Sequence, residues 1–172
     1  LITAFPFFPV IYKFKKQLKK KNIEFDVLKT SQYIREKILL RIIHKYDALL
    51  CGDDEITKKV IDKATNLKVI SKWGTGIDSI DKNYAIKKGI KIFNTPGAFT
   101  NGVATMALAM LLSFYRKINE NHNDIKKGQW KKYPGETLIR KKIGVIGIGN
   151  IGKTIFEMLQ GFNTINYGND LK

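Results

Sequence analysis

A glycine-rich turn between an apolar segment and a helical segment constrains the fold of this chain more than any other feature. The turn is GIGNIG over residues 147–152, and the apolar residues 143–146 before it are predicted to form a buried strand. Residues 153–159 are predicted to form a helix and residues 164–167 a second strand, which Asp170 follows. This order of strand, glycine turn, helix, strand and acid predicts the βαβ unit of a Rossmann fold.

Each glycine of the turn has a physical reason to be there. Gly147 permits the tight turn, Gly149 lets a pyrophosphate approach the backbone, and Gly152 lets the helix pack closely on the strand. The N–H groups that open the helix carry a partial positive charge, which favours phosphates. Asp170 can accept hydrogen bonds from ribose hydroxyls and would repel a 2′-phosphate, so the pattern indicates NAD as the cofactor. A structural turn of the same kind without a ligand is the alternative.

The first hundred residues alternate between strand and helix patterns. Predicted strands lie at residues 1–4, 24–28, 47–50, 68–71 and 90–93, and the segments between them have apolar residues at helical spacing. Such alternation predicts an α/β fold in which a parallel sheet is covered by helices on both faces. An apolar helix over residues 103–115 follows, and we expect Thr100 or Asn101 to cap it and two layers or domains to bury it.

A second glycine-containing loop follows the predicted strand at residues 68–71. Gly74 and Gly76 flank Thr75, so successive N–H groups can point into one concavity that suits a carboxylate or a phosphate. Lys72 adds a positive charge nearby, and Asp78 is expected to cap the next helix. A plain strand-to-helix turn is the alternative interpretation.

Composition excludes some partners. The formal net charge is +16, but only four of the 31 basic residues are arginines, the residue that base readout and phosphate clamps use most. We therefore expect no nucleic-acid partner, and a steep loss of DNA affinity with salt would be the sign of one. The apolar helix is too short to span a membrane, which needs about 20 residues. The single cysteine, Cys51, excludes an internal disulfide and fits a packed side chain in the reducing cytoplasm.

Three blocks of the sequence are similar to those of the D-isomer-specific 2-hydroxyacid dehydrogenase family. They are LKVISKWGTGIDSID over residues 67–81, NTPG over 94–97 with Val103 and Ala104, and GQW over 128–130 before the glycine turn. The resemblance implies a flavodoxin-like substrate-binding domain over residues 1–98 and the first part of a Rossmann NAD-binding domain over 99–172. It also implies a small-molecule 2-hydroxy or 2-oxo acid as substrate, no membrane partner, and a homodimer or larger homo-oligomer.

The resemblance also implies roles for individual residues. Thr75 and Gly76 would offer backbone groups to the substrate carboxylate, with Gly74 and Lys72 beside them. The expected cofactor contacts lie in the glycine turn and in three other places, namely Thr75, Val103, Gly147, Gly149, Asn150, Ile151, Gly152 and Asp170. Trp73 and Thr105 depart from the residues that many members carry there, which leaves the substrate open.

The catalytic arginine, glutamate and histidine of the family would come from the second half of the NAD-binding domain. Neither His44 nor His122 stands in the matching motif. We therefore expect this chain to be an N-terminal fragment that has no catalytic residues and no turnover alone, and whose segment after about residue 132 is mobile or prone to aggregate. An NAD-sensing module like the corepressors of the same family is the alternative function.

Overall fold

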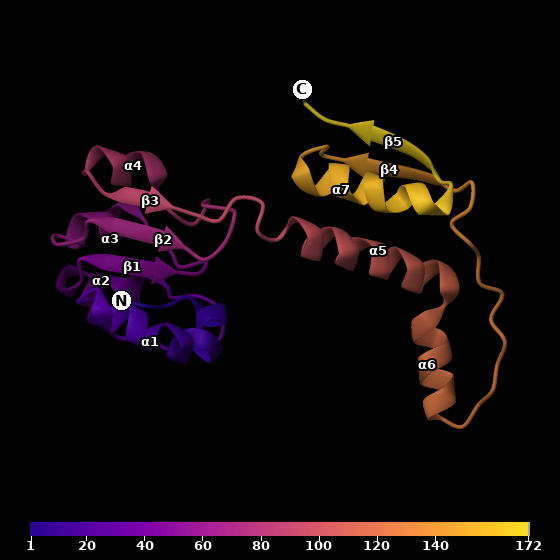
Figure 1. The fold of residues 1–172 in the computed structure, drawn as a ribbon, viewed down its shortest axis with the longest axis horizontal. Helices are drawn as coiled ribbons and strands as arrows, with labels where there is room; N and C mark the ends of the chain where they lie inside the picture. The colour runs from indigo at the N-terminus through magenta and orange to yellow at the C-terminus, as the bar shows by residue number, and fades with distance from the viewer. Residues whose placement is uncertain (172) are drawn as a thin grey trace. The chain divides into compact units, whose positions relative to one another are not determined.

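The computed structural model describes residues 1–171. They form two compact units, Leu1–Ala98 and the residues from Phe99 onward, which are joined through a turn-rich link (Figure 1). The first unit contains a three-stranded sheet and the second a two-stranded sheet. Each unit has the α/β architecture that the sequence predicted.

The sheet of the first unit is parallel and has the order β1-β2-β3, with β1 at Ala48–Cys51, β2 at Val69–Lys72 and β3 at Lys91–Phe93. The chain start continues this sheet, because Ile2 bridges to Leu50 on one side and to Val27 on the other, both in parallel. The spatial order of the five extended segments is then 2-1-3-4-5 along the chain. That is the flavodoxin-like order, and the predicted fold class is confirmed.

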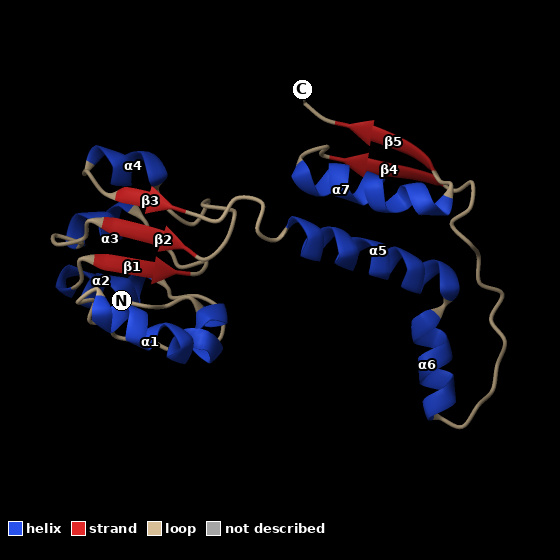
Figure 2. Ribbon diagram, in the orientation of Figure 1, coloured by secondary structure: helices blue, strands red, loops and turns tan. Residues whose placement is uncertain are grey.

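Short helices connect these strands (Figure 2). In chain order they are η1 (Phe5–Val10), α1 (Ile11–Lys20), α2 (Glu36–Ile42), η2 (Ile43–Lys45), α3 (Lys58–Lys63) and α4 (Lys82–Lys87). Their inward faces and the strands form one core around Leu49, Ile70 and Val60, and a smaller cluster holds Ile2 and Phe7. The apolar residues that the sequence placed at helical spacing supply about half of this core. In α2 the pattern chose the wrong face, because Leu39 and Ile43 are buried and Ile38 is exposed.

The second unit is built around the strands β4 (Lys142–Ile146) and β5 (Ile165–Asn169), which pair in parallel. Its helices are α5 (Thr100–Arg116), α6 (Ile118–Lys126), α7 (Asn150–Leu159) and the short η3 (Gln160–Phe162). One face of the β4–β5 pair carries α7, and α5 packs against α7 (Figure 1). Within residues 99–171, the other face of the pair carries no helix.

Several local predictions were wrong. The polar stretch after α5 forms the helix α6, which the sequence pattern did not indicate, and Lys117 separates the two helices in a left-handed conformation. The helix α5 has only Ala104 fully buried, although we expected it to be enclosed. Phe99 occupies its N-cap position instead of Thr100 or Asn101.

The N-terminal cap of α4 also differs from the prediction. The N-cap of α4 is Asp81, whose carboxylate accepts a hydrogen bond from the N–H of Tyr84, so the expected cap at Asp78 was wrong by three residues.

Among the residues that the structure describes, no helix has both the length and the apolar character that crossing a membrane requires.

Candidate functional site

The glycine turn 147–152 has the geometry that its glycines predicted. Gly147 has φ +90°, a conformation that L side chains rarely adopt, and its N–H donates to the carbonyl of Asn169 at 2.8 Å. A Cβ on Gly152 would lie 2.2 Å from the carbonyl oxygen of Gly147, closer than any real contact. The start of α7 therefore touches the turn itself, and only glycine permits that approach.

The other end of the turn is open. A Cβ on Gly149 would meet no atom within 4 Å, and Gly149 and Asn150 are exposed. In the part of the chain that the structure describes, the N–H groups of Gly149, Asn150, Ile151 and Gly152 donate no hydrogen bond to another residue. Four unsatisfied donors at the positive end of a ten-residue helix form a site that favours an anion.

Asp170 lies beside this turn, as the sequence predicted. One of its carboxylate oxygens accepts a hydrogen bond from the N–H of Ile148 at 2.6 Å, and the other accepts from the N–H of Leu171 at 2.7 Å. The residue is exposed, so the carboxylate is accessible from solvent. The fold thus places the Asp170 carboxylate on the N–H of Ile148, the residue just before the anion-binding amides. In the sequence, Asp170 lies 18 residues beyond Gly152.

The second candidate loop, residues 72–78, is tied to the segment after β3. The N–H of Thr95 donates to the carbonyl of Gly74 at 2.9 Å, and the side-chain amide of Asn94 donates to the carbonyl of Thr75 at 2.7 Å. The hydroxyl of Thr75 donates to the carbonyl of Thr95 at 3.1 Å. Sequence reasoning did not identify Asn94 or Thr95 as part of the site, although both stand in the NTPG block. These bonds fix the loop at the carboxyl end of the sheet.

The same loop has donors to spare. Within residues 1–171, the N–H groups of Thr75 and Gly76 make no hydrogen bond to the chain, and both residues are exposed. Gly74 has φ +157°, a backbone conformation that would be strained in a residue with a side chain. The loop can therefore offer consecutive amides to a carboxylate, as the nest interpretation requires.

Lys72 lies near this loop in a different way from the one the sequence suggested. Its side chain is 3% exposed, and its ammonium donates to the carbonyl of Gly52 and to a carboxylate oxygen of Asp53, both at 2.5 Å. The charge faces the loop that follows β1 and not open solvent. Sequence reasoning missed Gly52 and Asp53 because they are about twenty residues away along the chain, although both follow a neighbouring parallel strand.

Two buried groups lie under these loops. Burial raises the pKa of the Cys51 thiol to about 12, and the Sγ atom donates to the carbonyl of Ser71 at 3.7 Å. Desolvation also raises the pKa of Asp54, whose carboxylate accepts hydrogen bonds from the Thr3 hydroxyl and from the N–H of Ile34 at 2.6 Å. Cys51 is thus a packed, unreactive side chain, as predicted, and Asp54 ties the chain start to the sheet.

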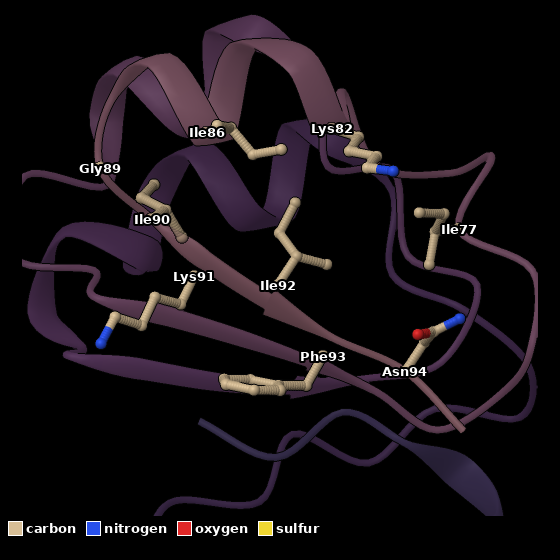
Figure 3. Close-up of a pocket in the computed structure, with 9 residues that line it drawn as sticks. All are labelled: Ile77, Lys82, Ile86, Gly89, Ile90, Lys91, Ile92, Phe93 and Asn94. Atoms are coloured by element: carbon tan, nitrogen blue, oxygen red, sulfur yellow. The ribbon is translucent and has the colours of Figure 1, made fainter. Parts of the chain in front are cut away.

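A shallow pocket runs along the free edge of β3. Ile86 of α4 and Ile92 of β3 point into the space between the helix and the strand, and Phe93 and Asn94 continue the wall (Figure 3). The pocket shares only Asn94 with the hydrogen-bonded loop described above. It is a mostly apolar depression beside the candidate site and contains none of the expected cofactor contacts.

The remaining predicted residues lie in different units of the chain or on its surface. Val103 lies half-exposed on α5, in the unit that carries the glycine turn, whereas Thr75 belongs to the first unit. His44 and His122 are both exposed. Within the described residues, no three His, Cys, Asp or Glu side chains form a group that could hold a metal ion.

Residues 7–167 match the family described as D-isomer specific 2-hydroxyacid dehydrogenase, catalytic domain. The chain belongs to this family. It is 36% identical over 149 residues to a hydroxypyruvate reductase of Thermotoga maritima, a match that covers 85% of this chain and 48% of that protein. It is 38% identical over 138 residues to a D-3-phosphoglycerate dehydrogenase of Archaeoglobus fulgidus, covering 78% of this chain and 26% of the relative.

Solved structures agree with the family. The TT0316 protein of Thermus thermophilus superposes with a TM-score of 0.85 at 27% identity, over 93% of this chain and 53% of that one. An NAD-dependent formate dehydrogenase of Staphylococcus aureus in complex with NAD superposes with a TM-score of 0.83 at 25% identity, over 99% of this chain and 56% of that one. The chain spans about half the length of the hydroxypyruvate and glyoxylate reductases that it matches.

Proposed function

We propose that the protein is an NAD-dependent oxidoreductase that interconverts a D-2-hydroxy acid and the corresponding 2-oxo acid. The observation that carries this proposal is the row of unpaired N–H groups from Gly149 to Gly152 with the Asp170 carboxylate next to it. A diphosphate suits the amides, and the diol of a ribose suits the carboxylate.

The cofactor assignment follows from those groups. Gly149, Asn150 and Ile151 would hold the pyrophosphate of NAD through their amides, and Gly147 and Gly152 would keep the turn tight enough to present them. Asp170 would accept hydrogen bonds from the ribose hydroxyls, and its negative charge would disfavour the 2′-phosphate of NADP. Val103 and Thr75 would contribute further contacts to the bound cofactor. When bound, NAD supplies the hydride acceptor, which amino-acid side chains cannot provide.

The substrate class follows from the other loop. The unpaired amides of Thr75 and Gly76 suit the carboxylate that 2-hydroxy and 2-oxo acids share. Relatives are named for hydroxypyruvate, glyoxylate and 3-phosphoglycerate, all of which contain this group. Among these we propose 3-phosphoglycerate, the substrate that would place the protein in serine biosynthesis, because a net charge of +16 favours the most highly charged anion.

The partner of the second unit is proposed to be another copy of the same chain. The helix α5 exposes an apolar stripe of four residues at helical spacing, namely Val103, Met106, Met110 and Phe114. Contiguous exposed apolar surface of this kind marks interaction sites on soluble proteins. A homo-oligomer is also what the family resemblance implied.

The cofactor proposal is tested by titrating the purified protein and its Asp170→Ala variant with NADH and with NADPH, using nicotinamide fluorescence. We expect the parent protein to prefer NADH and the variant to bind NADH about tenfold or more weakly, because hydrogen bonds to a charged group are lost. The variant should also lose the parent protein's preference for NADH over NADPH. Glu24→Ala removes an exposed acid from the first unit, outside both candidate loops, and should change neither affinity.

The outcome that contradicts the proposal is the absence of saturable NADH binding by the parent protein, or equal binding by the Asp170→Ala variant. The substrate is then assigned from initial rates of NADH oxidation with 3-phosphohydroxypyruvate, hydroxypyruvate and glyoxylate. These rates are measured on a protein that also carries the part of the fold that the relatives have beyond the match, because no turnover is expected from these residues alone. A higher kcat/KM for hydroxypyruvate or glyoxylate would reject 3-phosphoglycerate and keep the class.

A further inference from the structure

Lys72 is a buried cation at the end of β2. In the register of the sheet it stands opposite Cys51, so the two residues end neighbouring parallel strands. Its ammonium uses two of its three donors on the carbonyl of Gly52 and the carboxylate of Asp53. The Asp53 side chain is 80% exposed, so the pair extends from the interior to the surface of the loop after β1.

The backbone around Lys72 is shaped to accept this side chain. The N–H of Trp73 donates to the carbonyl of Cys51 at 2.8 Å, which continues the strand pairing one residue further. A Cβ on Gly74 would lie 3.2 Å from the Cε atom of Lys72, so a larger residue there would press on the lysine stem. The loop therefore folds back over its own lysine.

Hydrogen bonds hold the candidate substrate loop from both sides. On the β3 side it is bonded to Asn94 and Thr95, and on the β1 side it is bonded through Lys72 and the N–H of Trp73. Lys72 is the charged member of this set. The amides of Thr75 and Gly76, which make no hydrogen bond within the described residues, follow Lys72 by three and four residues.

A second ion pair links the same two strands at their other end and provides a comparison. Lys68 precedes β2 and pairs with Asp47, which precedes β1, at 2.8 Å, but both side chains are more than two-thirds exposed. Exposed pairs contribute little to stability, and pairing β1 with β2 does not need a buried one. The burial of Lys72 therefore serves the carboxyl end of the strands, where the candidate substrate loop begins.

We propose that Lys72 is a positioning residue for the substrate loop: its ammonium, clamped by Gly52 and Asp53, sets the amides of Thr75 and Gly76 for the substrate carboxylate without contacting the substrate. This inference deepens the proposed function and rests on it. It replaces the direct substrate contact that the charge of Lys72 suggested from the sequence.

The first test is peptide-resolved amide exchange on the 172-residue chain. We compare the parent with Lys72→Met, Asp53→Asn, the double variant and Lys68→Met as the matched control. Lys72→Met and Asp53→Asn should each speed exchange over residues 73–78 about tenfold, because the first removes the ammonium and the second removes the negative charge that the ammonium pairs with. The double variant should add little more, because both changes break the same link. Lys68→Met should leave the segment unchanged.

Unchanged exchange over residues 73–78 in Lys72→Met, or effects that multiply in the double variant, would overturn the clamp. This test needs no turnover, so it is separate from the proposed function. If Lys72→Met does not fold, Asp53→Asn alone decides, since Asp53 is exposed and its change leaves the core intact.

The second test uses NADH and hydroxypyruvate with a protein that carries these residues together with the part of the fold that the relatives have beyond the match, because no turnover is expected from these residues alone. A positioning role predicts that Lys72→Met and Asp53→Asn raise the KM for hydroxypyruvate by similar factors and leave the KM for NADH unchanged, because the glycine turn lies in the other unit. A large rise for Lys72→Met with none for Asp53→Asn would mean that the lysine contacts the substrate directly, and would overturn the proposal. Absence of activity in that longer protein would contradict the proposed function and leave the exchange test to decide on Lys72.

Discussion

The two units of the chain are built from the same kind of element but are stabilised differently. The first unit has a continuous core in which Leu49, Ile56 and Ile70 are fully buried. The second unit buries few side chains, chiefly Ala104, Leu138 and Leu159, and every residue of β5 is exposed. Its best-defined feature is the glycine turn, which local contacts fix. A functional loop can therefore be specified by its own backbone geometry where little core surrounds it.

This difference has consequences for how each unit can carry chemistry. In the first unit, the candidate loop is held by long-range hydrogen bonds from neighbouring loops and by a buried lysine. In the second unit, the turn is held by the close contact of Gly152 with Gly147 and by a single strand pairing. Substitutions of buried core residues should therefore destabilise mainly the first unit. Substitutions of the turn glycines should disturb mainly the candidate site in the second unit.

The largest expected effect comes from the same substitution in the two sheets. Ile70→Ala removes a side chain of zero exposure from β2 and should cost about 2–5 kcal/mol of unfolding free energy, because it leaves a cavity. Ile146→Ala removes a side chain that is 92% exposed at the end of β4 and should change stability by no more than about 0.5 kcal/mol. Urea unfolding followed by circular dichroism measures both. Equal losses would show that the two sheets are buried alike.

A smaller effect is expected for the thiol of Cys51, which reports on the first unit alone because it is the only cysteine. Burial raises its pKa from 9.0 to about 12, so its thiolate fraction at pH 8 should be about a thousandfold below that of an exposed cysteine. Reaction with an aromatic disulfide reagent should be correspondingly slow and should become fast in urea. Fast reaction of the folded chain would mean that the end of β1 opens readily.

The sequence predicted the glycine turn because the turn depends on a local pattern, and it predicted a parallel α/β sheet because strand and helix patterns alternate, whereas the flavodoxin-like arrangement came from the family resemblance. Gly147 has a positive φ, and Gly152 lies in close contact with Gly147. Both requirements favour glycine, so the residue type alone indicates them. The partners of Lys72 could not be predicted in this way, since they depend on the register that sets Cys51 beside Lys72. The apolar count of α5 predicted burial, but burial depends on what packs against a helix, and α7 covers only one side.

The helix α6 was missed for a related reason. Its residues are mostly polar, and it begins after Lys117, which has a left-handed backbone conformation. Lysine rarely adopts that conformation, so the residue type did not indicate a break between two helices there. Asp124 then anchors the segment that returns toward β4, because its carboxylate accepts a hydrogen bond from the hydroxyl of Tyr133 at 2.5 Å and pairs with Lys131. Contacts of this kind between polar side chains leave no periodic signal.

The central claim is that the open end of the glycine turn binds the diphosphate of NAD, and one pair of variants tests it directly. Gly149→Ala adds a methyl group where the chain has free space and where φ is −72°, so the fold should be unaffected while a ligand is blocked. Gly161→Ala adds the same group in equally free space in η3, away from the turn. In titrations with NADH, the account predicts saturable binding by the parent and by Gly161→Ala, and binding at least about tenfold weaker by Gly149→Ala with the same circular dichroism spectrum. Equal NADH affinity in all three proteins would contradict it.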